Sequence, residues 1–173
     1  MNYTHIQLAP DDEDNDVWTY YGLAAYYAQL LEKGVLQFVA MLEFVGLSSI
    51  GPGTAQQIFA SLDRHTLGQL MGAARTRATI PQHIDGMLSE SLEKRNFLVH
   101  KFFYHHGLNH LSESGRQMMV DELQRMAALF KRTDKELETI FLPLAAQLGI
   151  TEGVLERQYQ QLLAEWEDPI AAI

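Results

Sequence analysis

Apolar side chains recur at the spacing of a helix with one buried face along most of the chain. No segment alternates apolar and polar residues in the way that a half-buried strand does. The longest helical pattern covers residues 17–45 and predicts a long first helix. Its buried face is expected to carry Tyr20, Leu23, Tyr27, Leu30, Leu31, Phe38, Met41, Leu42 and Val45. The acidic run at residues 11–16 suits the start of this helix, because the helix dipole favours carboxylates there.

Helix-capping signals divide the segment that follows. Residues 46–53 are rich in glycine and serine and predict a loop. Thr54-x-x-Gln57 and Thr66-x-x-Gln69 each have the form of a capping box, in which two side chains satisfy the first backbone N–H groups of a helix. They predict two short helices, near residues 55–63 and 67–74.

The second half of the chain predicts three more helices. Pro81 is expected in the first turn of a long helix that reaches about residue 106, where Gly107 stops it. Ser114-x-x-Gln117 is expected to open the next helix, and Thr133-x-x-Glu136 marks a restart or kink within it. Thr151 is the expected cap of a last helix that ends before Pro169.

These patterns predict an all-α fold, a bundle of about four to five main helices with additional short ones. The chain has 173 residues, of which 47% are hydrophobic and 20% charged, which suits one packed domain and not two. We therefore expect a single domain over residues 1–173, with residues 1–16 as an acidic lead-in.

Composition and charge exclude several functions. The chain has no cysteine, so disulfides, zinc–thiolate sites, iron–sulfur clusters and thiol nucleophiles are excluded. Its formal net charge of −9 argues against a protein that coats duplex DNA, although one small site could still hold a single phosphate. The N-terminal residues lack the pattern of a signal peptide, and the longest apolar stretch is too short to span a bilayer. We expect a cytoplasmic protein that does not bind membranes.

One stretch of the predicted fourth helix carries candidate chemistry. If Arg95 is set to zero on a wheel of about 100° per residue, an apolar set lies within about 80° of it. That set is Ile84, Leu88, Leu92, Leu98, Val99, Phe102 and Phe103. Arg95 thus lies near the centre of an apolar stripe, where an unpaired guanidinium would be costly. Asn96 and His100 are four residues apart at the edge of the same stripe, within reach of Arg95.

Arginine, asparagine and histidine at this spacing suit RNA cleavage without a metal. The histidine can act as general base or acid when a ribose 2′-hydroxyl attacks the neighbouring phosphate, and the guanidinium can stabilise the charge that develops. Because one chain supplies one such histidine, a two-fold dimer would be needed for a second. The same residues also have a structural interpretation, in which Arg95 pairs with a carboxylate of another helix and His100 is an ordinary interface histidine.

The stretch Arg95-Asn96-Phe97-Leu98-Val99-His100 resembles the Arg-Asn-x-x-x-His motif of HEPN domains, which are all-α proteins that include ribonucleases and toxins. The resemblance covers roughly residues 17–130. It implies a HEPN-like bundle that acts as a homodimer, with Arg95, Asn96 and His100 as catalytic residues. Beside them, Lys101 and Tyr104 are expected to contact the substrate.

The resemblance also implies partners. RNA would be the substrate, an antitoxin or regulatory protein would be a further partner, and the role would be that of a toxin or of a stress or defence effector. It implies neither a metal nor a cofactor. In HEPN toxins regulated by nucleotidyltransferase antitoxins, a modified tyrosine stands two places after the histidine, where this chain has Phe102. The alternative that stays open is a non-catalytic HEPN-like module that binds a nucleotide, RNA or a protein.

Two other patterns suggest weaker hypotheses. Residues 47–58 resemble the helix-hairpin-helix element of DNA-binding proteins, in which a Gly-x-Gly turn offers backbone N–H groups to a phosphate. The helix after the turn, however, carries glutamines where such elements have lysine or arginine. Four histidines at positions 100, 105, 106 and 110 lie close together, yet no acidic residue within 101–112 completes a metal site.

Overall fold

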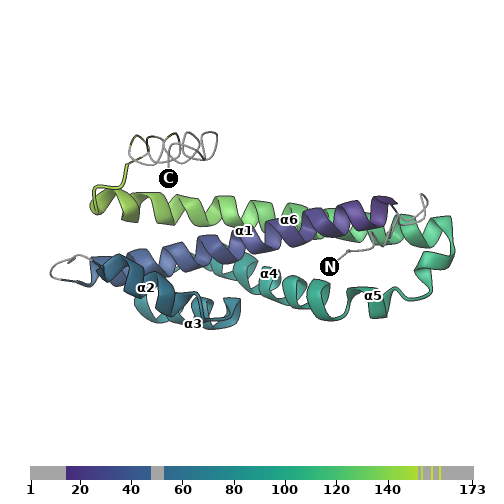
Figure 1. Ribbon diagram of the computed structural model, residues 1–173, viewed down its shortest axis with the longest axis horizontal. Coiled ribbons are helices and arrows are strands. Elements are labelled where there is room, and N and C mark those ends of the chain that lie inside the picture. The colour runs from purple at the N-terminus through teal and green to yellow at the C-terminus, as the bar shows by residue number, and fades with distance from the viewer. Residues whose placement is uncertain (1–14, 48–52, 152, 154–156, 158–159, 161–173) are drawn as a thin grey trace, which may run out of the picture.

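The computed structural model describes residues 15–47, 53–151, 153, 157 and 160 (Figure 1). Within these residues every regular element is helical, which confirms the predicted all-α class. In chain order the elements are α1 (Asn15–Val45), α2 (Thr54–Leu62), α3 (Leu67–Arg77), α4 (Gln82–His100), α5 (Phe102–His105), the 3-10 helix η2 (Asn109–Leu111) and α6 (Glu113–Gln147). Most of the helix predicted to follow Thr151 lies outside the described residues.

The two longest helices, α1 and α6, share the most extensive helix–helix contact of the fold. They lie side by side and run in the same direction, while α4 runs the opposite way beside them (Figure 1). The short helices α2 and α3 pack against the C-terminal half of α1. α5 and η2 form the connection at the other end of the bundle.

The predicted first helix is confirmed, and its buried face is confirmed in part. Of the residues expected there, Leu31, Phe38 and Met41 are buried, and Tyr20, Tyr27 and Leu42 are partly buried against the core. Fully or almost fully buried positions in α1 include Val17, Ala24, Ala28, Leu31, Val35, Phe38 and Val39. Leu23, Leu30 and Val45 were expected in the core and are instead 39%, 40% and 45% exposed. The two alanines allow close approach of neighbouring helices, and a prediction that weights large side chains misses that contribution.

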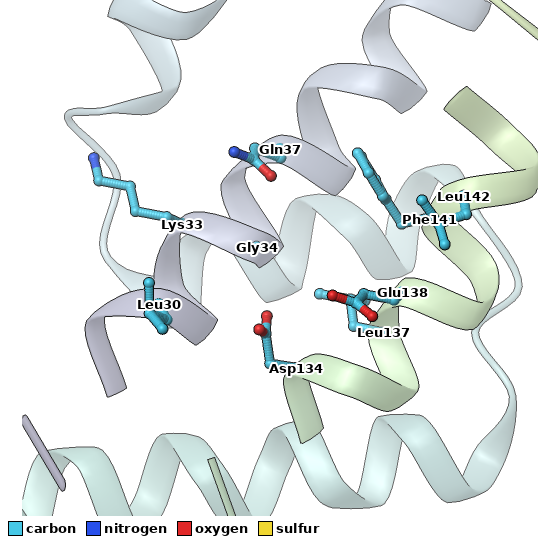
Figure 2. Close-up of a pocket in the computed structure, with 9 residues that line it drawn as sticks. All are labelled: Leu30, Lys33, Gly34, Gln37, Asp134, Leu137, Glu138, Phe141 and Leu142. Carbon is cyan, nitrogen blue, oxygen red and sulfur yellow. The ribbon is translucent and has the colours of Figure 1, made fainter. Parts of the chain in front are cut away.

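One glycine of α1 leaves room for an acidic side chain of α6. A Cβ atom added at Gly34 would lie 2.5 Å from Asp134 Oδ1 and 3.7 Å from Leu137 Cδ2. Figure 2 shows the Asp134 carboxylate of α6 directed at the α1 backbone where this side chain is missing. Gly34 therefore leaves room for the Asp134 carboxylate between the two helices, and apolar contact holds the parallel pair together.

The α6 helix begins earlier and continues further than predicted. Its N-cap is Ser112, whose hydroxyl accepts a hydrogen bond from the backbone N–H of Gly115, so the predicted start at Ser114 is wrong. The restart predicted at Thr133 is also wrong, because α6 is unbroken there. Thr133 is fully buried, donates its hydroxyl to the Leu129 carbonyl, and hydrogen-bonds the buried Ser91 of α4 at 3.0 Å. A Thr hydroxyl satisfied in this way needs no helix end.

The α4 helix is shorter than predicted. Pro81 is its N-cap and not part of its first turn, and the helix ends at His100, well before Gly107. Lys101 leaves the helical region with φ −133° and ψ −18°, and the four residues of α5 follow it as a separate turn. No glycine, proline or cap signal marks position 101, so the sequence gives no local reason to expect this break.

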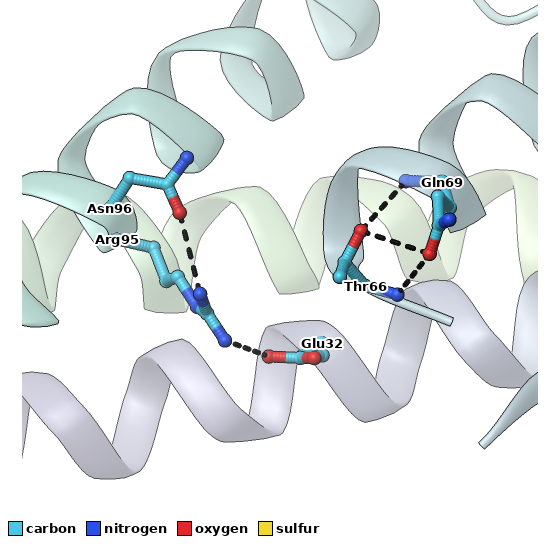
Figure 3. A network of polar contacts seen from close by, with 5 residues as sticks. All are labelled: Glu32, Thr66, Gln69, Arg95 and Asn96. Carbon is cyan, nitrogen blue, oxygen red and sulfur yellow. Dashed lines mark hydrogen bonds and ion pairs between the residues drawn. The ribbon is translucent and has the colours of Figure 1, made fainter. Parts of the chain in front are cut away.

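Of the two predicted capping boxes, one is present. Thr66 Oγ1 accepts from the Gln69 backbone N–H, and the Gln69 side chain accepts from the Thr66 backbone N–H at 2.8 Å (Figure 3). At α2 the N-cap is Gly53, with φ +82°, and no side chain caps the helix. Thr54 is therefore the first residue of α2 and not its cap, since glycine adopts this left-handed conformation at no steric cost.

We predict that Gly115→Ala destabilises the protein. A Cβ at this position would collide with the backbone of Asn109, whose Cα would be 2.8 Å away, so η2 and α6 would have to separate. The cost should be about 1–3 kcal/mol, which exceeds the gain of about 1 kcal/mol from replacing a helical glycine. Thermal unfolding would show a melting temperature lower by several degrees.

The matched control is Gly86→Ala in α4, where an added Cβ meets no atom within 4 Å. This variant should be stabilised by about 0.5–1 kcal/mol, because alanine restricts the unfolded chain. If both alanine variants moved the melting temperature in the same direction, the close contact between Gly115 and Asn109 would not be the cause of the change in stability.

Candidate functional site

Arg95 is held by two neighbours on the face of α4 that meets α1. Its Nη2 lies 3.2 Å from Glu32 Oε2 of α1, and its Nη1 donates to Asn96 Oδ1 at 3.3 Å (Figure 3). The side chains of Arg95 and Glu32 are 27% and 26% exposed. The guanidinium is thus partly buried and paired, as the structural interpretation of the sequence required, but it is not sealed from solvent.

A pocket of about 470 Å³ lies beside this ion pair. Arg95 is part of its wall, together with Glu32 and Lys33 of α1 and with Asp63 and His65, which follow α2. A guanidinium carries five N–H donors in a rigid plane, and the two contacts above use only some of them. The remaining donors can bind an anion or a polar group in the pocket without loss of the Glu32 contact.

Asn96 and His100 lie one helical turn apart and are both exposed. His100 is the last residue of α4, and among the described residues its side chain has no hydrogen-bond or ion-pair partner. The structure therefore brings Arg95 and Asn96 together but places no contact between His100 and either of them within one chain. An exposed imidazole at a helix end is accessible to a substrate or to a second molecule.

The two residues expected to contact substrate follow directly. Lys101 is exposed at the break between α4 and α5, and the Tyr104 side chain is 93% exposed. Val99, which the helical wheel placed in the apolar stripe, is also exposed, at 51%. The wheel is wrong at this point, because Arg95, which was taken as the centre of the buried face, is itself partly exposed. By contrast Ile84, Leu88, Leu98 and Phe102 are buried as predicted.

Of the four clustered histidines, His106 has a structural role. This side chain is 5% exposed, and its Nε2 lies 2.9 Å from Glu122 Oε2 of α6. The Asn109 Nδ2 amide lies 2.7 Å from Nδ1 and can only donate, so Nδ1 accepts this hydrogen bond and the Nε2–H donates one to Glu122 Oε2. Both ring nitrogens are thereby used in fastening α5 and η2 to α6. Within the described part of the chain, no three side chains of ligand type gather as a metal site would require.

A second pocket, of about 290 Å³, lies between α1 and α6 around Gly34 (Figure 2). Asp134 and Glu138 project into it from α6, and Lys33 and Gln37 line it from α1. Partial burial raises the pKa of the Asp134 carboxyl above its ordinary value, and the nearby Glu138 carboxylate raises that pKa further. An acid of this kind opposes folding when it is ionised.

Several residues of the candidate site were not found from the sequence. Glu32 is separated from Arg95 by 63 positions, and nothing in the pattern around residue 32 distinguishes it from the other charged residues of α1. The ion pair between Lys33 and Asp63 was missed for the same reason. Of the expected helix-hairpin-helix turn, residues 48–52 lie outside the described residues, and the observed part is the left-handed Gly53 before α2.

Comparison with models of protein families, with curated proteins and with solved structures finds no match for this chain. None of the described helices is both long enough and apolar enough to cross a membrane.

We predict that Asp134→Asn stabilises the protein at neutral pH. Since the pKa of Asp134 is raised in the folded state, the folded protein binds this proton more tightly than the unfolded chain does. Stability from this group therefore increases as the pH falls through the raised pKa, and the ionised form costs stability above it. The gain should stay below about 1 kcal/mol, because the carboxylate keeps part of its hydration.

Thermal unfolding of both proteins at about pH 7 and about pH 4 measures the effect, since acidification protonates a growing share of the wild-type carboxyl. The difference in melting temperature should be largest at neutral pH and should shrink on acidification. Asp121→Asn, a change at an exposed hydrogen-bonded aspartate of the same helix, is the control. A difference that stayed constant between the two pH values would contradict the assignment.

Proposed function

We propose that the protein is a metal-independent endoribonuclease of the HEPN type that acts as a homodimer, as a toxin or as a stress or defence effector. The observation that carries the proposal is the position of Arg95. Its guanidinium is oriented by Glu32 and Asn96 at the wall of an open pocket, and an exposed histidine stands five residues further along the same helix. Cleavage of a phosphodiester requires an oriented cation and an accessible base, and two chains in a dimer would have to bring these groups together.

The reaction uses the substrate's own nucleophile. His100 accepts the proton of a ribose 2′-hydroxyl, whose oxygen attacks the adjacent phosphorus, and the bond from phosphorus to the 5′-oxygen breaks. The leaving oxygen takes a proton from a second acid, so that the products are a 2′,3′-cyclic phosphate and a 5′-hydroxyl. Arg95 donates to the phosphate oxygens, on which negative charge accumulates in the transition state.

The second acid is the reason for a dimer. One chain offers one His100, and a two-fold partner would supply the other imidazole together with a second Arg95. Exposed Val99 and Tyr104 next to His100 support a contact at this end of α4, because apolar groups with no cover are favourable at an interface. Lys101, exposed beside them, would contact the RNA backbone.

A non-catalytic binding module is the second candidate, and one observation favours it. The contact between Arg95 and Glu32 already neutralises the guanidinium, which is what a purely structural arginine needs. In this case the same surface would bind a nucleotide, RNA or a protein such as an antitoxin without cleaving anything.

We predict that His100→Ala and Arg95→Lys each reduce RNA cleavage in the presence of EDTA by at least about a hundredfold, the range of one acid–base or charge-stabilising group. Lysine keeps the charge that faces Glu32 but loses the planar set of donors, so the fold is preserved while phosphate binding is impaired. Cleavage of a labelled RNA followed on a denaturing gel measures the loss, and circular dichroism confirms folding.

His83→Ala is the matched control, because His83 is another exposed histidine of α4 whose nearest acid, Glu136, is 3.7 Å away. It should leave cleavage unchanged. Equal cleavage by wild type and by both site variants would contradict the nuclease mechanism. If the wild type bound RNA without cutting it, and the site variants did not bind RNA, the second candidate would be favoured.

A further inference from the structure

The pocket beside Arg95 has more recognition chemistry than one phosphate needs. Its floor is apolar, with Leu36 of α1 and Leu70 of α3 only 6% and 1% exposed. Tyr26, at the rim, is 55% exposed and contacts Tyr27 edge-on with ring centroids 5.4 Å apart. A pocket of about 470 Å³ with an aromatic rim and an apolar floor is of a size that takes a flat ring.

The polar wall of the pocket presents donors and acceptors in equal number. Glu32 pairs with Arg95, and Lys33 Nζ lies 2.5 Å from Asp63 Oδ1. The Lys33 hydrogen bond and charge lower the pKa of the Asp63 carboxyl, which therefore stays ionised and accepts hydrogen bonds. The formal charges of these two ion pairs cancel, so the wall can accept a neutral group that has both donors and acceptors.

Among the nucleobases, guanine matches this wall best. Its N1–H and its exocyclic amine are adjacent donors that fit the two oxygens of one carboxylate, and its O6 and N7 are adjacent acceptors that fit a cation. Adenine and the pyrimidines lack the adjacent pair of donors. Asp63 can serve as that carboxylate, since each of its oxygens accepts two hydrogen bonds and Lys33 uses one position on Oδ1.

We propose that this pocket binds a guanine base of single-stranded RNA, next to the phosphate that Arg95 contacts. The inference rests on the proposed function and gives it a base preference. Asp63 accepts from the Watson–Crick edge, Tyr26 stacks on the ring, and Lys33 donates to the acceptor edge. Stacking on an aromatic side chain and hydrogen bonds to an exposed base edge are how proteins read unpaired RNA.

The test separates binding from cleavage. Short fluorescent 2′-O-methyl oligonucleotides that differ only in the central base cannot be cut, because the attacking hydroxyl is blocked, and fluorescence polarisation gives their affinities. We expect the oligonucleotide with guanine to bind about tenfold more tightly than the other three. Asp63→Asn should remove this preference, because its amide would face a donor of guanine, and Tyr26→Ala should weaken binding of every base.

Asp63 is exposed and its pair with Lys33 contributes little to stability, so Asp63→Asn should fold. Asp121→Asn, which lies on α6 and is not part of this pocket, is the control and should keep the preference. The affinity for guanosine monophosphate is measured as well. If it bound at least as tightly as the guanine oligonucleotide, the ligand would be a free nucleotide and the assignment to RNA would be overturned.

The remaining outcomes distinguish this inference from the nuclease proposal. If the protein preferred guanine through Asp63 but cut no RNA, guanine binding in the pocket would be supported and the nuclease mechanism would be contradicted. Cleavage that depends on Arg95 and His100, with equal affinity for all four bases, would overturn the pocket and leave the mechanism in place.

Discussion

The contact between α1 and α6 is the interaction on which the remaining structure depends. These two helices bury their apolar faces against each other along most of their length. α4 can then pack on both of them, and its position decides where Arg95 meets Glu32. The candidate site is therefore a product of helix packing: α1 provides one wall of the pocket, α4 provides the cation, and the connection after α2 provides the second acid.

Three polar pairs join segments that are distant in sequence. Ser91 and Thr133 join α4 to α6, and His106 joins α5 to Glu122 of α6. The Arg95–Glu32 pair is the most exposed of these three, and it borders a pocket while the other two do not contribute to that pocket. Complete pairing in the core makes the fold specific, whereas incomplete burial at Arg95 is what allows the same residue to face a ligand.

The sequence predicted the helices better than the site. Apolar spacing and the Thr66 box were sufficient to place α1 and α3, because these signals are local. The Thr54 signal placed α2 correctly, although Thr54 is its first residue and not its cap. The break at Lys101 and the continuity of α6 through Thr133 depend on tertiary contacts, and local signals predicted both wrongly. Arg95 and Asn96 were predicted to converge and do so, while Glu32, Lys33 and Asp63 could not be predicted, because pairing across distant helices leaves no local pattern. The family resemblance and the nuclease activity stay predictions.

The parallel arrangement of the first and last long helices has a consequence for how the chain is made. α1 leaves the ribosome well before the residues of α6 that cover its apolar face, so the nascent chain exposes an uncovered amphipathic helix while the middle segments emerge. The core closes only through contacts of long sequence separation, a topology that slows folding relative to a bundle built from neighbouring hairpins. During that interval the exposed face is a target for chaperones and for self-association.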